Sequence, residues 1–260
     1  MSFTDEQRND FAERLHRAAR TGTQVPMLTA EVPFEVKEAY VIQEAVIQKR
    51  IDEGFPLIGM KMGLTSLAKM EQMGVDSPIY GHLTSDMLLD DGEVLDISPY
   101  GHPRVEPEVA FILDQDIKGP ITSAQVNTVV RGVCAALEII DSRYENFKFT
   151  LPDVVADNAS STRFVLGSEL RRADEIDLGN LGMVLEVDGE AVQIGSSAAI
   201  YEHPMRSLST LVNMLAEREQ GLKAGQIILA GGATAAVALS PGQRVRVRVQ
   251  SLGEASFFTK

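Results

Sequence analysis

The hydrophobic pattern of this sequence changes at Gly54, and that change limits the folds that the chain can adopt. Before Gly54, apolar residues recur at helical spacing in two segments, one beginning at the cap residue Thr4 and one covering residues 33–53. After Gly54, short apolar runs are separated by Gly and Pro, which is typical of strands and turns. We therefore expect an N-terminal helical region at residues 1–55 and a mixed β core at residues 56–260.

Within the second region, helices and strands do not alternate regularly. Strands are expected at residues 58–64, 93–97, 104–113, 182–187, 227–230 and 243–250, and helices at residues 123–136 and 204–219. A doubly wound parallel sheet would require a helix after each strand. The order of the elements therefore favours the α+β class, with one compact core.

The composition excludes several classes of protein. The 260 residues carry a formal net charge of −13, and no cluster of Lys or Arg could follow a nucleic-acid backbone. The N-terminal segment is charged throughout, and no apolar run approaches the roughly 20 residues needed to span a bilayer. We therefore expect a cytoplasmic protein without nucleic-acid or membrane partners. The single cysteine, Cys134, lies in an apolar run and is expected to be a core residue.

Three glutamates occur inside apolar segments. Glu106 and Glu108 are two positions apart in the strand predicted at residues 104–113, so they share one face of it. Glu138 has apolar neighbours on both sides. A buried carboxylate becomes protonated, pairs with a cation or binds a metal, because an unpaired buried charge is strongly destabilising. The pattern alone leaves two interpretations open: solvent-facing glutamates on half-exposed strands, or a site for a hard divalent cation.

Five segments resemble the hydratase/decarboxylase branch of the fumarylacetoacetate hydrolase superfamily, and the resemblance covers nearly the whole chain. They are GMKMGLTS at residues 59–66, GVDSPIYG at residues 74–81, RVEPEV at residues 104–109, LEIIDSRYENF at residues 137–147 and VADNASSTRF at residues 155–164. The resemblance implies a mixed β-barrel or β-roll core with peripheral helices. It also implies a divalent cation, Mg²⁺ or Mn²⁺, held by Glu106, Glu108 and Glu138.

The branch contains two activities, and residue 79 distinguishes them. Its hydratases add water to a dienol acid and tend to carry an acidic residue after Pro78, whereas its decarboxylases resemble this chain, which has Ile79. Hydration needs a placed acid/base, which an isoleucine cannot supply. The resemblance therefore implies metal-dependent decarboxylation of 4-oxalocrotonate (2-oxo-3-hexenedioate) in aromatic meta-cleavage catabolism, with Ile79 in an apolar wall beside the departing carboxylate. Hydration of 2-hydroxypenta-2,4-dienoate and a non-catalytic stabilising subunit are the alternatives.

Further residues are expected to bind a small 2-oxo dicarboxylic acid. Lys61 lies in a turn bounded by glycines and is the best candidate for a catalytic cation, which an acidic protein needs to attract an anion, although a solvated strand lysine would show the same pattern. The resemblance places Asp157, Ser160 and Thr234 beside the substrate, and Arg163 is a candidate partner for its distal carboxylate. A homo-oligomer and a complex with the hydratase of the pathway are also expected.

Overall fold

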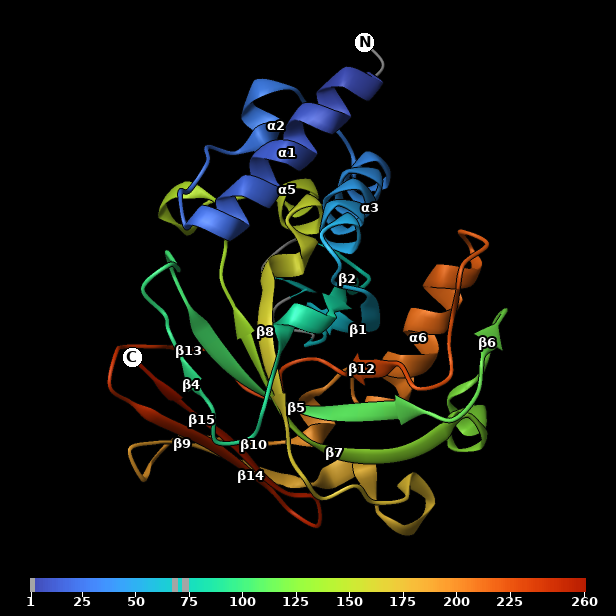
Figure 1. Ribbon diagram of the computed structural model, residues 1–260. Coiled ribbons are helices and arrows are strands. Elements are labelled where there is room, and N and C mark those ends of the chain that lie inside the picture. Colours follow the sequence, from blue (N-terminus) through green and yellow to red (C-terminus); the bar gives the residue numbers. More distant parts are fainter. Residues whose placement is uncertain (1–2, 67–69, 72–74) are drawn as a thin grey trace.

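The computed structural model describes residues 3–66, 70–71 and 75–260, and Figure 1 shows a group of helices above a curved β body. Three N-terminal helices come first: α1 (Asp5–Thr21), α2 (Leu28–Glu31) and α3 (Val36–Asp52). Thr4 caps α1 by accepting a hydrogen bond from the Gln7 N–H, and Gly22 ends it with a φ of 71°, a conformation that favours glycine. The two helices predicted before Gly54 are confirmed.

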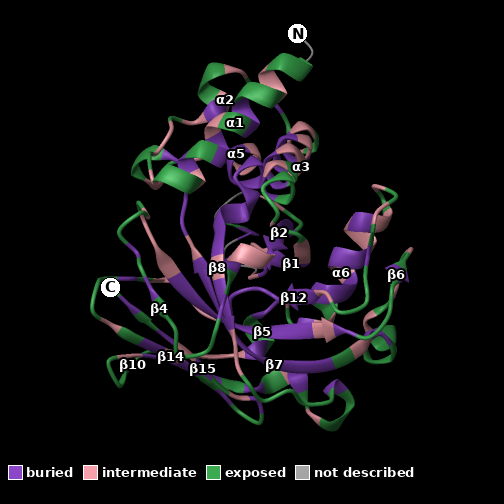
Figure 2. Cartoon of the chain, viewed as in Figure 1, coloured by how far each residue is buried: buried purple, intermediate pink, exposed green. Residues whose placement is uncertain are grey.

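An eight-stranded sheet forms the centre of the molecule, with the order β2-β1-β12-β5-β7-β8-β3 and with β13 paired to β5. Its strands are β1 (Leu57–Gly63), β2 (Ile79–Thr84), β3 (Leu88–Leu89), β5 (Arg104–Leu113), β7 (Val130–Ile140), β8 (Ser161–Leu166), β12 (Ile227–Leu229) and β13 (Val237–Ala238). Figure 2 shows that the long central strands β5 and β7 are buried over most of their length. Side chains on both faces of these strands therefore lie inside the protein.

A second sheet packs against the first. Its order is β10-β9-β14-β15-β4, with β4 (Val94–Leu95), β9 (Gly182–Val187), β10 (Glu190–Ser196), β14 (Arg244–Val249) and β15 (Gly253–Thr259). A separate antiparallel pair joins β6 (Ile117–Lys118) to β11 (Gly221–Leu222). Val109 and Phe111 of β5 belong to the same apolar core as Val247 and Phe257 of the second sheet. This core leaves the opposite face of β5, which carries the glutamates, to the functional site.

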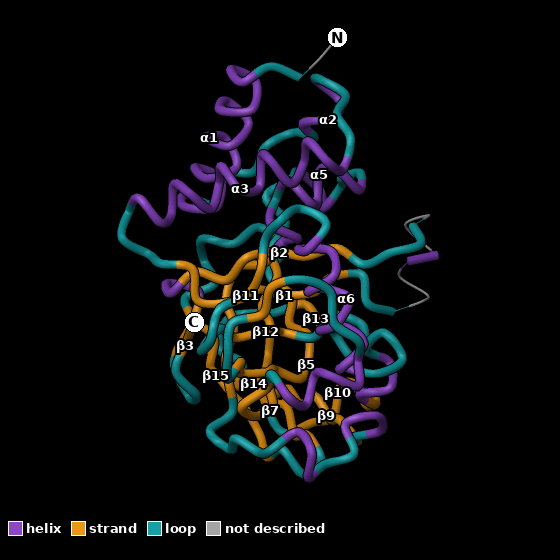
Figure 3. Tube along the Cα trace, turned by 90° about the vertical axis from the view of Figure 1, so that its right-hand side faces the viewer, coloured by secondary structure: helices purple, strands orange, loops and turns teal. Residues whose placement is uncertain are grey.

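Two further helices complete the described part of the chain, α5 (Leu151–Ala156) and α6 (Pro204–Ala216), and short 3₁₀ segments connect the strands. The 3₁₀ segments are Ser85–Met87, Ser123–Thr128, Glu145–Phe147, Asn158–Ser160, Ala173–Glu175, Leu178–Asn180 and Ser197–Ala199. Figures 1 and 3 both place α1, α3 and α5 at the end of the molecule where β2 lies. Among the described helices, none is long and apolar enough to cross a bilayer. Cys134 is buried in a small apolar cluster, which confirms its prediction as a core residue.

The helix predicted at residues 123–136 is wrong. A 3₁₀ segment at Ser123–Thr128 leads into β7, which pairs with β5 in register from Arg104 opposite Ile140 to Leu113 opposite Val130. A strand buried on both faces has a continuous apolar sequence, and periodicity alone cannot separate such a sequence from a buried helix. The pairing with β5 decides the conformation here.

Pro107 lies at a break in the sheet rather than at its edge. β12 pairs with Ala110 to Ile112 of β5, and β13 pairs with Arg104 and Val105, so none of the described strands pairs with Pro107 on that side. The Pro107 carbonyl accepts a hydrogen bond from the Ala233 N–H there, at 2.9 Å. Because the N–H and C=O of one antiparallel residue point to the same side, the donor that proline lacks is not needed by the β5–β7 ladder.

Candidate metal and substrate site

The three predicted glutamates meet in the interior of the central sheet. Glu106 and Glu108 project from one face of β5, and Glu138 of β7 lies directly opposite Glu106 in the register. One carboxylate oxygen from each lies within 4.8 Å of the others, and the three residues are 6%, 0% and 0% exposed. The interpretation of these residues as solvent-facing strand glutamates is therefore wrong.

Lys61 of β1 lies against this carboxylate cluster. Its Nζ is 3.0 Å from Glu138 Oε2 and donates a hydrogen bond to the Ala159 carbonyl at 3.1 Å. Burial alone would lower the pKa of Lys61, but the nearby carboxylates, Glu138 first, raise it above its usual value. Lys61 is therefore a buried, protonated ammonium, and the alternative that it is a solvated strand lysine is wrong.

The carboxylate cluster holds more negative charge than the buried surroundings stabilise. Burial raises the pKa of Glu108 well above its usual value and also raises that of Glu138, in spite of Lys61. Among the described residues, no donor reaches Glu108 Oε1, while the Gly231 N–H donates to Glu108 Oε2 at 2.7 Å. Three carboxylates that converge with an unpartnered oxygen form the donor set that a hard divalent cation prefers. The residues present therefore fit Mg²⁺ or Mn²⁺.

Two glycines allow the chain to approach the carboxylate cluster at the break in the sheet. Gly231 has a φ of +113°, and a Cβ there would lie 2.1 Å from Thr65 Oγ1. A Cβ on Gly232 would lie 2.9 Å from Glu106 Cδ and Oε1. The resemblance implied a substrate contact at the nearby Thr234, but the close approach of these glycines to Glu106 and Glu108 was not predicted. The paired glycines after an apolar strand were the signal for such an approach.

A cavity of about 720 Å³ opens beside the carboxylate cluster. Lys61, Glu106 and Ser160 line its polar part, whereas Ile79, Phe147 and Val154 contribute to an apolar wall. Ile79 is close to Lys61, since a Cβ on Gly63 would lie 3.1 Å from Ile79 Cγ1 and 3.7 Å from Lys61 Nζ. Cationic, anionic and apolar groups thus share one cavity, as a site for an amphipathic organic anion requires.

The segment Asn158–Ser160 contains three consecutive residues with positive φ, at 52°, 49° and 58°. Asn158 fixes it to β2, because its Oδ1 accepts from the His82 N–H at 2.7 Å and its Nδ2 donates to the His82 carbonyl at 2.9 Å. Each non-glycine residue in this conformation costs about 1–2 kcal/mol. The strained segment presents the Ala159 carbonyl to Lys61 and Ser160 to the cavity.

Three predicted substrate-binding residues lie outside the described lining of this cavity. The Asp157 carboxylate pairs with the Arg143 side chain and accepts a hydrogen bond from the Arg143 N–H at 3.1 Å. Arg163 donates to the Thr162 carbonyl and lies over the Tyr100 ring at 5.9 Å. Thr234 donates to the Ala235 carbonyl at 3.1 Å, and Ala235 and Ala236 line the cavity instead.

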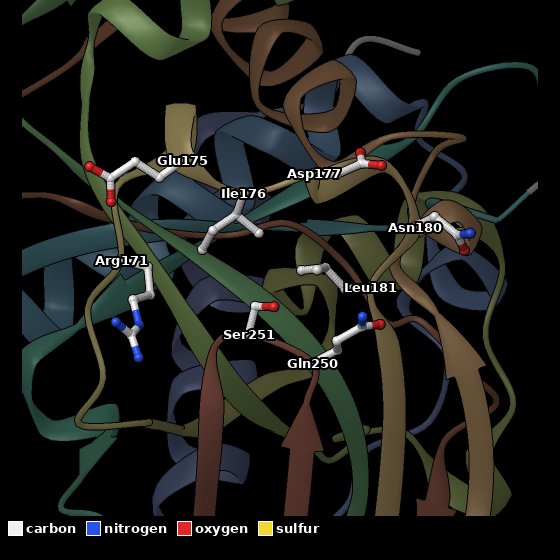
Figure 4. A pocket seen from close by; sticks show the side chains of 8 residues that line it. All are labelled: Arg171, Glu175, Ile176, Asp177, Asn180, Leu181, Gln250 and Ser251. Carbon is white, nitrogen blue, oxygen red and sulfur yellow. The ribbon is translucent and has the colours of Figure 1, made fainter.

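A second cavity, of about 490 Å³, lies away from these residues. Figure 4 shows its lining, which comes from residues 171–181 and from the β14–β15 turn and includes Arg171, Asp177 and Gln250. None of the predicted site residues is among the described residues that line it. Its polar side chains come from the surface, and Arg171 is paired with Glu169 at 2.8 Å. The cavity beside the glutamates is therefore the candidate functional site.

Comparison with known proteins shows the family to which this chain belongs. The family model described as fumarylacetoacetate (FAA) hydrolase, C-terminal, matches residues 62–257. The chain belongs to the fumarylacetoacetate hydrolase family. The resemblance found in the sequence and the α+β fold that it implied are thus confirmed. Of the segment at residues 74–81, Gly74 lies outside the described residues.

Within the fumarylacetoacetate hydrolase family, this chain is similar to decarboxylases over its full length. A 4-oxalocrotonate decarboxylase from Pseudomonas sp is 49% identical over 249 residues, which are 96% of each chain. The solved structure of 4-oxalocrotonate decarboxylase from Pseudomonas putida G7, complexed with magnesium and adipate, has a TM-score of 0.97 at 41% identity, covering 100% of this chain and 99% of that one. A 2-keto-4-pentenoate hydratase from Paraburkholderia xenovorans (strain LB400) is 36% identical, covering 96% of this chain and 94% of the hydratase.

Proposed function

We propose that this protein is a metal-dependent carboxy-lyase that converts 4-oxalocrotonate (2-oxo-3-hexenedioate) into 2-hydroxypenta-2,4-dienoate and CO₂, as a step of aromatic meta-cleavage catabolism. The observation that carries the proposal is the arrangement of Glu106, Glu108 and Glu138 with the buried Lys61 beside an apolar wall that contains Ile79. The higher identity to the decarboxylase than to the hydratase, 49% against 36%, supports the same activity.

Glu106, Glu108 and Glu138 are the residues that would hold Mg²⁺ or Mn²⁺. When bound, such a cation supplies Lewis-acid stabilisation of negative charge on a substrate oxygen. Ser161 orients Glu138 by donating to its Oε1 at 2.8 Å, and the Gly231 N–H orients Glu108. These hydrogen bonds fix the carboxylates from outside the cluster, as the supporting groups of metal ligands commonly do.

Lys61 stabilises the charge that the reaction generates. The bond between C5 and C6 of the substrate breaks and CO₂ leaves, while its electron pair moves through the conjugated chain and leaves negative charge on the C2 oxygen. A proton taken up by that oxygen completes the dienol product. A fixed ammonium in a buried site stabilises such charge far better than one in water, because the local dielectric constant is low. The hydrogen bond to the Ala159 carbonyl holds the Lys61 ammonium in position.

Whereas Lys61 contributes a charge to the site, Ile79 contributes an apolar side chain. Its side chain is buried and lines the cavity beside Lys61. An apolar wall disfavours an ionised carboxylate and favours neutral CO₂. We expect Ile79→Asp to lower decarboxylation about 10-fold or more, because a second anion in this wall is unfavourable. Unchanged turnover in this variant would remove Ile79 from the mechanism.

The activity is tested by supplying 4-oxalocrotonate with Mg²⁺, with and without EDTA, and measuring CO₂ and the dienol product. We expect both products with Mg²⁺ and neither after chelation. The hydratase alternative predicts water addition to 2-hydroxypenta-2,4-dienoate and no CO₂. The scaffold alternative predicts that Glu106→Gln leaves the activity of a partner hydratase unchanged, whereas an enzyme loses its own activity.

The assembly and location of the protein are part of the proposal. We infer a cytoplasmic homo-oligomer that also forms a complex with the hydratase of its pathway, because the product of one enzyme is the substrate of the other. Sedimentation velocity of the protein alone and mixed with that hydratase tests this inference. A monomer that does not change its sedimentation coefficient in the mixture would contradict both parts.

A further inference from the structure

The cavity beside the glutamates contains two further cationic side chains that the activity described above does not use. Arg104 and Lys148 line it together with Phe147. In a protein with a net charge of −13, cations that line a cavity oppose the overall repulsion of an anionic ligand. The two differ in burial, since Arg104 is half-buried and Lys148 is exposed.

Arg104 lies at a defined distance from the carboxylate cluster. It is two residues before Glu106 in β5, so the two side chains share a face and their Cα atoms are separated by about 7 Å. An extended chain of six carbon atoms has a similar length. A dicarboxylate with one end at Glu106, Glu108 and Glu138 therefore brings its other end to the level of Arg104.

The guanidinium of Arg104 is fixed but has no anionic partner in the described part of the chain. It lies over the Phe147 ring, 4.8 Å from the centroid, which restricts its orientation. Two other partly or fully buried arginines have a carboxylate partner: Arg50 pairs with Asp86 at 3.0 Å, and Arg218 pairs with Glu44 at 2.6 Å. A stacked arginine without a carboxylate is preorganised to bind a carboxylate ligand through two hydrogen bonds.

We propose that Arg104 determines specificity for dicarboxylates by binding the substrate carboxylate farthest from the metal-binding glutamates, a proposal that rests on the function inferred above. Arg104 replaces Arg163 in this role, because Arg163 is not among the described residues that line the cavity. Lys148 is a weaker candidate because an exposed, flexible ammonium lacks the planar fork that matches a carboxylate.

The proposal predicts a particular split of the kinetic constants. The carboxylate bound by Arg104 is the one that leaves as neutral CO₂, so the ion pair stabilises the substrate more than the transition state. Removing an interaction that is stronger in the bound substrate than in the transition state weakens substrate binding but does not slow the chemical step. Arg104→Gln should therefore raise KM about 10-fold or more while kcat stays the same or rises.

Direct binding tests the same contact without turnover. Calorimetry in Mg²⁺ compares adipate, a six-carbon dicarboxylate, with hexanoate, which has the same length and one carboxylate. We expect the native protein to prefer adipate, Arg104→Gln to bind adipate about 10-fold or more weakly with hexanoate unchanged, and Arg104→Lys to recover part of the preference. Arg171→Gln, the same change of charge beside the cavity of Figure 4, should behave as the native protein.

The outcomes separate this inference from the proposed function. Equal adipate binding by the native protein and Arg104→Gln, or a fall in kcat at unchanged KM, would overturn the role of Arg104 even if CO₂ is released. A loss of adipate preference in Arg104→Gln supports the inference even if 4-oxalocrotonate is not decarboxylated, in which case the proposed reaction fails and the dicarboxylate site stands. Equal thermal unfolding of the variants excludes misfolding as the cause.

Discussion

Replacing Gly232 by alanine tests whether the turn at the break in the sheet positions the metal-binding carboxylates. The added Cβ would lie 2.9 Å from Glu106 Cδ and Oε1, whereas ordinary van der Waals contact begins at 3.4 Å. The Glu106 carboxylate must therefore retreat by about 0.5 Å, if the backbone of Gly232 does not move. Gly232 has no positive φ, so the substitution adds this contact without straining the backbone.

A displacement of this size is large for a metal ligand. Metal-binding and catalytic sites need their ligands held within about 0.5 Å of the productive geometry. Changes in the groups that orient metal ligands typically cost 10- to 100-fold in metal affinity. We therefore expect Gly232→Ala to raise the Mg²⁺ dissociation constant by about 10- to 100-fold. Overpacking should also lower the free energy of unfolding of the metal-free protein by about 1–3 kcal/mol.

Calorimetric titration with Mg²⁺, and with Mn²⁺ in parallel, measures the effect. Gly182→Ala is a matched control, because its Cβ would lie 3.5 Å from Gln250 Oε1, in ordinary contact at an exposed strand end. It should leave the affinity unchanged. A Gly232→Ala protein that binds Mg²⁺ within twofold of the native affinity would refute the argument that this turn sets the position of Glu106.

Three further predictions concern buried ionisable side chains. Lys61→Met should lower the rate of decarboxylation at least about 100-fold, because a preorganised cation is lost. The Mg²⁺ affinity should be kept or increased, because the ammonium 3.0 Å from Glu138 is gone. CO₂ release measures the first effect and calorimetry the second, and a parallel loss of Mg²⁺ binding would contradict the prediction. Glu108→Gln should raise the unfolding temperature of the metal-free protein, since it removes a fully buried carboxylate with a raised pKa. The same variant should lose the stabilisation that Mg²⁺ gives the native protein. A lower unfolding temperature would show that the surroundings of Glu108 already stabilise its carboxylate. Burial lowers the pKa of His82 from 6.5 to about 4, so the unfolded chain binds its proton first and stability falls as the pH drops from 6.5 towards 4, by up to about 3 kcal/mol. His82→Asn, whose amide can still donate to Gln43, should flatten this part of the urea-denaturation profile, and an unchanged slope would exclude His82 as its origin.

The sequence could predict the buried glutamates because their chemistry is visible locally. Glu106 and Glu108 are two positions apart in an apolar strand, and this spacing alone places them on one buried face. Glu138 could be recognised as a buried acid, but its position opposite Glu106 depends on the register between β5 and β7. Register is a tertiary property, set by which side chains must be buried on each face. The mistaken helix at residues 123–136 had the same origin.

The residues that line the cavity were harder to predict because a strained turn orients some of them. Asp157 and Ser160 are three positions apart, yet Asp157 pairs with Arg143 and Ser160 lines the cavity. The positive φ values of Ala159 and Ser160 produce this reversal, and neither residue type favours that conformation. Only Asn158 is a type that often adopts it. Arg104, the first residue of a predicted strand, was not recognised as a cavity residue, because the Phe147 ring over which it lies is distant in the sequence.

The segment Asn158–Ser160 also has a consequence for how the protein folds. Its stabilising partners are distant in sequence: His82 lies 76 positions from Asn158, and Lys61 lies 98 positions from Ala159. A strained turn gains nothing from forming before those partners are in place, since loop closure must precede the contacts that offset the strain. We therefore expect β1 and β2 to join the sheet first and the turn to close last, so that a refolding chain regains its secondary structure before it regains activity.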